Sequence, residues 1–141
     1  MVMRSGICML LGFLTIASLV GCSQSKPEIS AEGTVTVDGQ ALSGAVMTFE
    51  PMGQTTGPKA SAPVFSGKFS LPPNNGLHGG SYRVRFSMIP AGVLRSLPDE
   101  QKAGLPPSDA VIAPEFDENS KLECTLQPDQ ENILEFDVSF L

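Results

Sequence analysis

Apolar and polar residues alternate in short runs from Glu32 onward, and turn-forming residues separate the runs. In the first run Val35 and Val37 share one side, and Asp38-Gly39 closes it as a hairpin-type turn. The clearest alternation covers residues 81–88. Its apolar positions are Tyr82, Val84, Phe86 and Met88, and its polar positions are Ser81, Arg83, Arg85 and Ser87. A period of two residues predicts strands with one face in a core.

Further runs repeat this pattern. Their apolar positions are Met47 and Phe49, Phe69 and Leu71, Leu122 to Leu126, and Leu134 to Val138. Pro63 lacks a backbone donor, so segment 59–65 is expected at a sheet edge if it is a strand. Residues 111–116 are expected to be extended.

Residues 89–107 interrupt the alternation. Ser96 is expected as the N-cap of a short helix, since Pro98 and the acidic Asp99 follow within the first turn. Gly104 would end that helix within about two turns. The insertion is therefore expected to be a short helix or a loop.

The spacing of these runs predicts an all-β fold, an antiparallel β-sandwich over residues 32–141, which the family resemblance described below makes immunoglobulin-like. The chain contains 14 glycines and 12 prolines, which argue against long helices. Its 141 residues suffice for one ordinary domain and are too few for two.

Residues 1–21 have the pattern of a signal peptide, expected as an N-terminal helix. Arg4 is their only charged residue, and an apolar run follows from Ile7 to Val20. That run has about fourteen residues, whereas a membrane-spanning helix needs about twenty.

The segment Leu19-Val20-Gly21-Cys22 resembles the lipobox of bacterial lipoproteins. The resemblance implies that the Cys22 sulfur is diacylglycerated, that the leader is cut, and that the new amine is acylated, with palmitate as a typical chain. Residues 22–31 would then be a lipidated N-terminus and flexible tether. Ser23, where an Asp would retain such a protein at the inner membrane, favours the outer membrane if the host has one. The other interpretation is an ordinary secretory signal with an incidental cysteine.

The net charge of −6 disfavours a nucleic-acid partner, because such proteins need a basic face. The charges are scattered singly, as on an ordinary solvated surface.

Several motifs in order resemble carboxypeptidase regulatory-like domains: GTVTVDG at 33–39, GKF at 67–69, GSYRV at 80–84 and a tail over 113–138. The resemblance implies a transthyretin-like (prealbumin-like) sandwich of about seven strands. It also implies a non-catalytic structural or binding module of the cell envelope. The alternative is an accessory subunit that binds another envelope protein through its outward strands and the 89–107 loop. A hydrolase is a remote third class, since one histidine and scattered carboxylates assemble no nucleophile–base pair.

No cofactor, metal site or catalytic residue is expected. His78 is the single histidine, in a Gly-rich and Asn-rich loop, and is expected as a surface residue rather than a ligand. The acidic stretches 117–119 and 129–131 lack the ligand spacing of a calcium loop and are expected to be turns. Cys124 lies on an alternating apolar face and is expected to be a buried structural thiol.

Arg83 and Arg85 lie on the outward face of the Tyr82 run. They could bind an acidic polysaccharide or an envelope protein, or they could simply solvate an exposed strand. Together with the membrane at Cys22, these are the partners that the sequence suggests.

Overall fold

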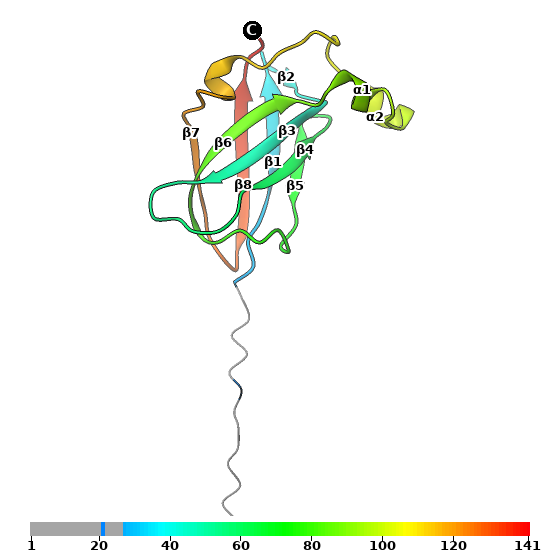
Figure 1. The fold of residues 1–141 in the computed structure, drawn as a ribbon. Helices are drawn as coiled ribbons and strands as arrows, with labels where there is room; N and C mark the ends of the chain where they lie inside the picture. The colour runs from blue at the N-terminus through cyan, green and yellow to red at the C-terminus, as the bar shows by residue number, and fades with distance from the viewer. Residues whose placement is uncertain (1–20, 22–26) are drawn as a thin grey trace, which may run out of the picture.

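The structure, a computed structural model, describes residue 21 and residues 27–141 (Figure 1). Almost all of the predicted leader, Cys22 as its lipid site, and the first part of the tether lie outside the described residues.

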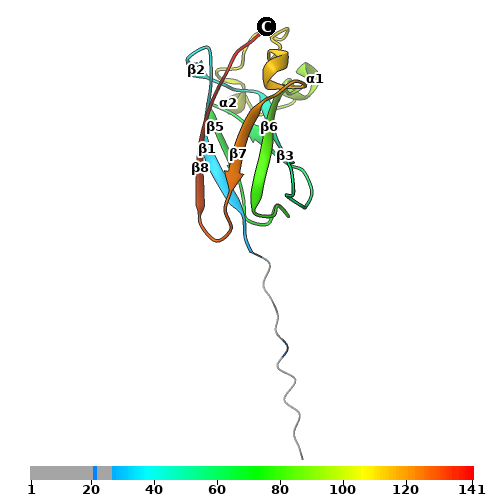
Figure 2. The same cartoon turned by 90° about the vertical axis from the view of Figure 1, so that its left-hand side faces the viewer.

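In the described part of the chain, eight strands form two four-stranded sheets. Sheet A contains β1 (Ser30–Val37), β2 (Gln40–Ala41), β5 (Lys68–Leu71) and β8 (Glu131–Val138). Sheet B has the order β4-β3-β6-β7, from β4 (Ala60–Val64), β3 (Ala45–Pro51), β6 (Gly80–Met88) and β7 (Leu122–Leu126). The sheets lie against each other as two layers (Figures 1 and 2), which confirms the predicted all-β sandwich. The count exceeds the expected seven because the two-residue β2 folds back on the end of β1.

One strand pair departs from the expected antiparallel arrangement. β1 and β8 are parallel over their whole lengths, from Ser30 opposite Glu131 to Val37 opposite Val138. The turn before β8 lies beside the start of β1, where the Asp129 N–H donates to the Glu28 carbonyl at 3.0 Å. Because β8 starts at the end where β1 starts, the two strands run in the same direction.

The alternating apolar residues form one core between the sheets. The most completely buried large side chains include Tyr82, Phe49, Phe86 and Met47. Tyr82 meets Phe49 edge-on at 6.4 Å between ring centroids. Each fully buried side chain of this size stabilises the fold by about 1.5–3 kcal/mol relative to exposure.

Two tight hairpins have the backbone that their residues predict. Asp38 and Gly39 have φ of 49° and 80°, and Val37 pairs with Gln40 across them. This is the geometry of a two-residue hairpin whose central residues have positive φ. Ser66-Gly67 repeats it between β4 and β5, with φ of 51° and 72°.

The sandwich begins earlier than residue 32. Ile29 is buried in the core, with 1% of its surface exposed, and β1 starts at Ser30. Residues 29–31, predicted as part of a tether, therefore belong to the sandwich, because the apolar Ile29 packs between the sheets.

The insertion contains two short helices, α1 (Ala91–Leu94) and α2 (Asp99–Lys102). The prediction of Ser96 as an N-cap is wrong: its hydroxyl donates back to the Val93 carbonyl at 2.7 Å, and α2 follows Pro98. The expectation that residues 111–116 are extended is wrong for 114–116, whereas 111–113 pair with residues 139–141. Ile112 makes a single bridge to Phe140. A 3-10 turn, η1 (Pro114–Phe116), follows it. Pro114 begins this turn, because its fixed φ suits a helical conformation.

The two ends of the sandwich differ in what they carry. Residue 27 enters at one end, and the insertion, η1 and residue 141 lie at the opposite end (Figures 1 and 2). We call these the proximal end and the distal end.

Candidate functional site

Charged side chains meet on the outer face of sheet B. Strand register places Glu50 of β3 directly opposite Arg83 of β6, and Lys59 precedes β4 on the other side of Glu50. Lys59 Nζ lies 2.9 Å from Glu50 Oε1, Arg83 Nε lies 2.9 Å from Glu50 Oε2, and Arg83 Nη2 also donates to Oε2. Arg85 Nη1 adds a bond of 3.2 Å to Oε1.

Glu50 is the centre of this network. Its side chain is 7% exposed, and three cations surround its carboxylate. Hydrogen bonds from Lys59 and then Arg83 lower the Glu50 pKa from its usual 4.5 to about 2. A nearly buried carboxylate is tolerated here because every oxygen is paired, as desolvation of an unpaired charge would be costly.

Arg85 connects the sheet to the segment after η1. Its Nη2 lies 2.9 Å from Asp117 Oδ1, and its Nε donates to the Asp117 carbonyl at 3.0 Å. The Asp117 carboxylate raises the Arg85 pKa. Both arginines that the sequence suggested for partner binding thus have carboxylate partners within the protein. Partner binding at Arg83 and Arg85 stays a prediction.

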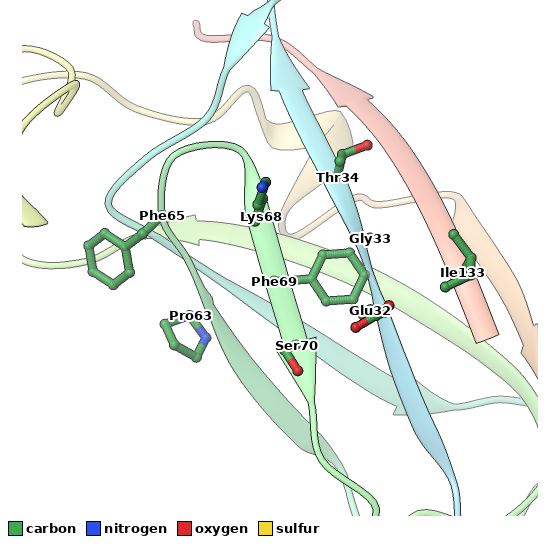
Figure 3. A pocket seen from close by; sticks show the side chains of 9 residues that line it. All are labelled: Glu32, Gly33, Thr34, Pro63, Phe65, Lys68, Phe69, Ser70 and Ile133. Atoms are coloured by element: carbon green, nitrogen blue, oxygen red, sulfur yellow. The ribbon is translucent and has the colours of Figure 1, made fainter. Parts of the chain in front are cut away.

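A hollow of about 580 Å³ lies over the outer face of sheet A (Figure 3). Figure 3 shows its residues in a row: Pro63 and Phe65 beside β5, then Lys68 to Ser70 on β5, Glu32 to Thr34 on β1, and Ile133 on β8. The hollow therefore draws on four segments that are far apart in the sequence.

The polar groups of this hollow differ from those on sheet B. Its four polar side chains are Glu32, Thr34, Lys68 and Ser70, and all are exposed. Within the described part of the chain, none of them takes part in a side-chain hydrogen bond or ion pair. Carboxylate, ammonium and hydroxyl groups together offer both donors and acceptors to a ligand.

Gly33 is required at the floor of this face. A Cβ atom on Gly33 would lie 1.7 Å from the Leu134 carbonyl oxygen of β8. The close approach of β1 and β8 thus excludes any side chain at this position.

His78 lies on the surface, as its loop suggested. Its Nδ1 lies 2.9 Å from Thr56 Oγ1. Tyr82 OH donates to the His78 carbonyl at 2.5 Å, so the buried tyrosine holds the loop through its backbone. Within the described residues, the imidazole makes no hydrogen bond or ion pair with a carboxylate or thiol.

Cys124 faces the core side of β7 and is half-buried. Burial raises the pKa of its thiol to about 11, so little thiolate exists at neutral pH. Among residues 21 and 27–141, no group of three His, Cys, Asp or Glu side chains could hold a metal ion. In the same residues no helix has the length and apolar character needed to cross a membrane.

Sequence reasoning missed both Glu50 and Phe65. A signal for Phe65 existed: Val64 and Phe65 are adjacent, and in a strand of period two only one of them can face the core. Val64 is fully buried and Phe65 lies outside. No comparable signal identified Glu50, because its partners depend on strand register.

Comparison with family models, curated proteins and solved structures gave no match to this chain, and the resemblance to carboxypeptidase regulatory-like domains therefore stays a prediction.

Proposed function

We propose that this protein is exported, anchored to the cell envelope by lipid at Cys22, and carries a non-catalytic β-sandwich as a structural or binding module. The lipobox-like segment before Cys22 is the sequence support. Each buried methylene of an acyl chain contributes about 0.8 kcal/mol, so several chains anchor a protein stably.

The position of residue 27 is the structural observation that carries the proposal. Pro27 stands at the proximal end, while the insertion and the last residue stand at the distal end (Figure 1). The five residues from Cys22 to Pro27 span at most about 18 Å when extended. An anchor at Cys22 would thus keep the proximal end near the bilayer and direct the distal end away from it.

A second candidate, an accessory subunit, is favoured by the insertion. Neither α1 nor α2 contains a buried residue, and both lie at the distal end. A pocket of about 340 Å³ between them is lined by Leu94, Leu105 and Pro106 together with Arg95 and Lys102. Half-buried apolar side chains at this position are consistent with contact to another envelope protein.

Cell fractionation of a Cys22→Ala variant tests the anchor. We expect the wild-type chain to sediment with membranes and to incorporate radiolabelled palmitate, and the variant to do neither. Cys124→Ala is the matched control, because it removes a cysteine of the sandwich and should leave both properties unchanged. An unchanged distribution of Cys22→Ala would refute the anchor.

A further inference from the structure

We propose that the hollow on the outer face of sheet A binds a neutral saccharide chain of the cell envelope, an inference that rests on the proposed function. A volume of about 580 Å³ is within the range of ligand sites in proteins.

The polar groups of the hollow match a ligand with many hydroxyls. Glu32 can accept hydrogen bonds, Lys68 can donate them, and the Thr34 and Ser70 hydroxyls can do both. Since none of the four has a side-chain partner in the described residues, a ligand would not have to displace an internal bond. A sugar presents donors and acceptors around its ring and can engage all four.

The apolar groups of the hollow match the other side of a sugar ring. Among the phenylalanines in the described part, Phe65 alone neither belongs to the core nor packs against it. Ile133, at the other end of the row, is 57% exposed. The face of an aromatic ring carries negative charge, and the axial C–H bonds of a sugar are weakly positive, so the two stack favourably.

The layout favours a polymer of sugars over a peptide strand. The row crosses from the end of β4 over β5 and β1 to β8, and three inter-strand steps cover about 15 Å. That distance would accommodate more than one sugar unit. β1, in the middle of the row, is paired with β5 on one edge and β8 on the other, so its backbone has no free edge for an added strand.

Charge makes the preferred saccharide neutral. Glu131, Glu135 and Asp137 share the outward face of β8 with Ile133, and Glu32 lies opposite Ile133 on β1. Lys68 is the single cation among the residues that line the hollow. Of these carboxylates Glu32 alone lines the hollow, where Lys68 balances its charge. Glu131 and Glu135 stand two positions from Ile133 on the same strand, and their negative charge beside the hollow disfavours uronic acids, sulfates and phosphates.

The experiment uses the full-length protein as its own cells produce it, purified in detergent whether or not Cys22 carries lipid. Polysaccharide from the envelope of the producing cells is separated by ion exchange into neutral and acidic fractions and fluorescently labelled. Polarisation then measures the binding of each fraction. We expect the neutral fraction to bind the wild-type protein. Its affinity for Phe65→Ala should be about tenfold weaker than for wild type, because the apolar contact is lost. Its affinity for Lys68→Ala should be about three- to tenfold weaker than for wild type. Val111→Ala and Lys121→Ala, which remove an exposed apolar residue and a lysine outside the hollow, should bind as wild type.

Periodate treatment, which cleaves vicinal diols, should abolish binding, and protease treatment should not. Ser70→Arg is a second variant, in which a long side chain at an exposed position of β5 fills the hollow without entering the core; it too should lose binding. The inference would be overturned by any of four results. These are no binding of the neutral fraction, binding of the acidic fraction alone, loss of binding after protease treatment, and full binding by Phe65→Ala and Ser70→Arg. The measurement does not depend on the membrane, so failure of the anchor and failure of the hollow are separate results.

Discussion

The outer faces of the two sheets both carry charged side chains, but within the described residues these side chains form ion pairs on sheet B and none on sheet A. On sheet B, Glu50 is buried under Lys59, Arg83 and Arg85, and every charged group of that cluster has a partner within the protein. On sheet A, Glu32 and Lys68 flank a hollow and make no ion pair in the described residues. Charges that already have internal partners stabilise the fold, whereas unpaired groups around a concave surface are available to a ligand. The comparison therefore supports the proposed binding site on sheet A, although the arginines of sheet B are the more conspicuous feature of the sequence.

The largest expected effect separates the core from the hollow. Tyr82 is fully buried, so Tyr82→Ala should lower the free energy of unfolding by about 3–5 kcal/mol. Phe65→Ala should lower it by no more than about 1 kcal/mol, since Phe65 is outside the core. Urea unfolding followed by far-ultraviolet circular dichroism measures both. Equal effects would show that Phe65 is a structural residue.

A smaller effect should separate the two faces directly. Glu50→Gln keeps the shape of the side chain but removes the negative charge that Lys59, Arg83 and Arg85 share. We expect a loss of about 2–3 kcal/mol, below the value for a fully buried pair because Arg83 and Lys59 remain partly hydrated. The matched change on sheet A, Glu32→Gln, should alter the free energy of unfolding by less than about 0.5 kcal/mol. If Glu32→Gln lowered the free energy of unfolding more than Glu50→Gln does, the stabilising charges would lie on sheet A and not on sheet B.

The smallest effect concerns acid. The Glu50 pKa is lower in the folded protein, about 2, than the usual 4.5 expected when unfolded. The stability that the ionised Glu50 contributes to the folded protein is therefore fully present above pH 4.5, and it is lost as the pH falls from 4.5 through about 2. We expect the free energy of unfolding to fall less steeply over this window in Glu50→Gln than in wild type, measured by urea unfolding between pH 2 and 6. Parallel curves would mean that Glu50 contributes nothing to acid sensitivity.

Local pattern was sufficient for much of the fold. Alternation identified the inward residues of β3, β5 and β6, and Asp38-Gly39 was identified as a turn because glycine readily adopts positive φ. Pro63 was expected at an edge, and β4 is an edge strand of sheet B. The helix start at Ser96 was wrong because suitable residue types near one another do not decide which of them caps.

The candidate sites depend on pairing between distant strands. Arg83 meets Glu50 across 33 residues of sequence, and the hollow joins Glu32 to Ile133 through the parallel register of β1 and β8. The sequence by itself determined which side of each strand is apolar, because side-chain direction follows from the two-residue repeat of the backbone. Only the tertiary structure decided which charges neutralise one another and which are left free, because strand order and register are set by the packing of the whole core.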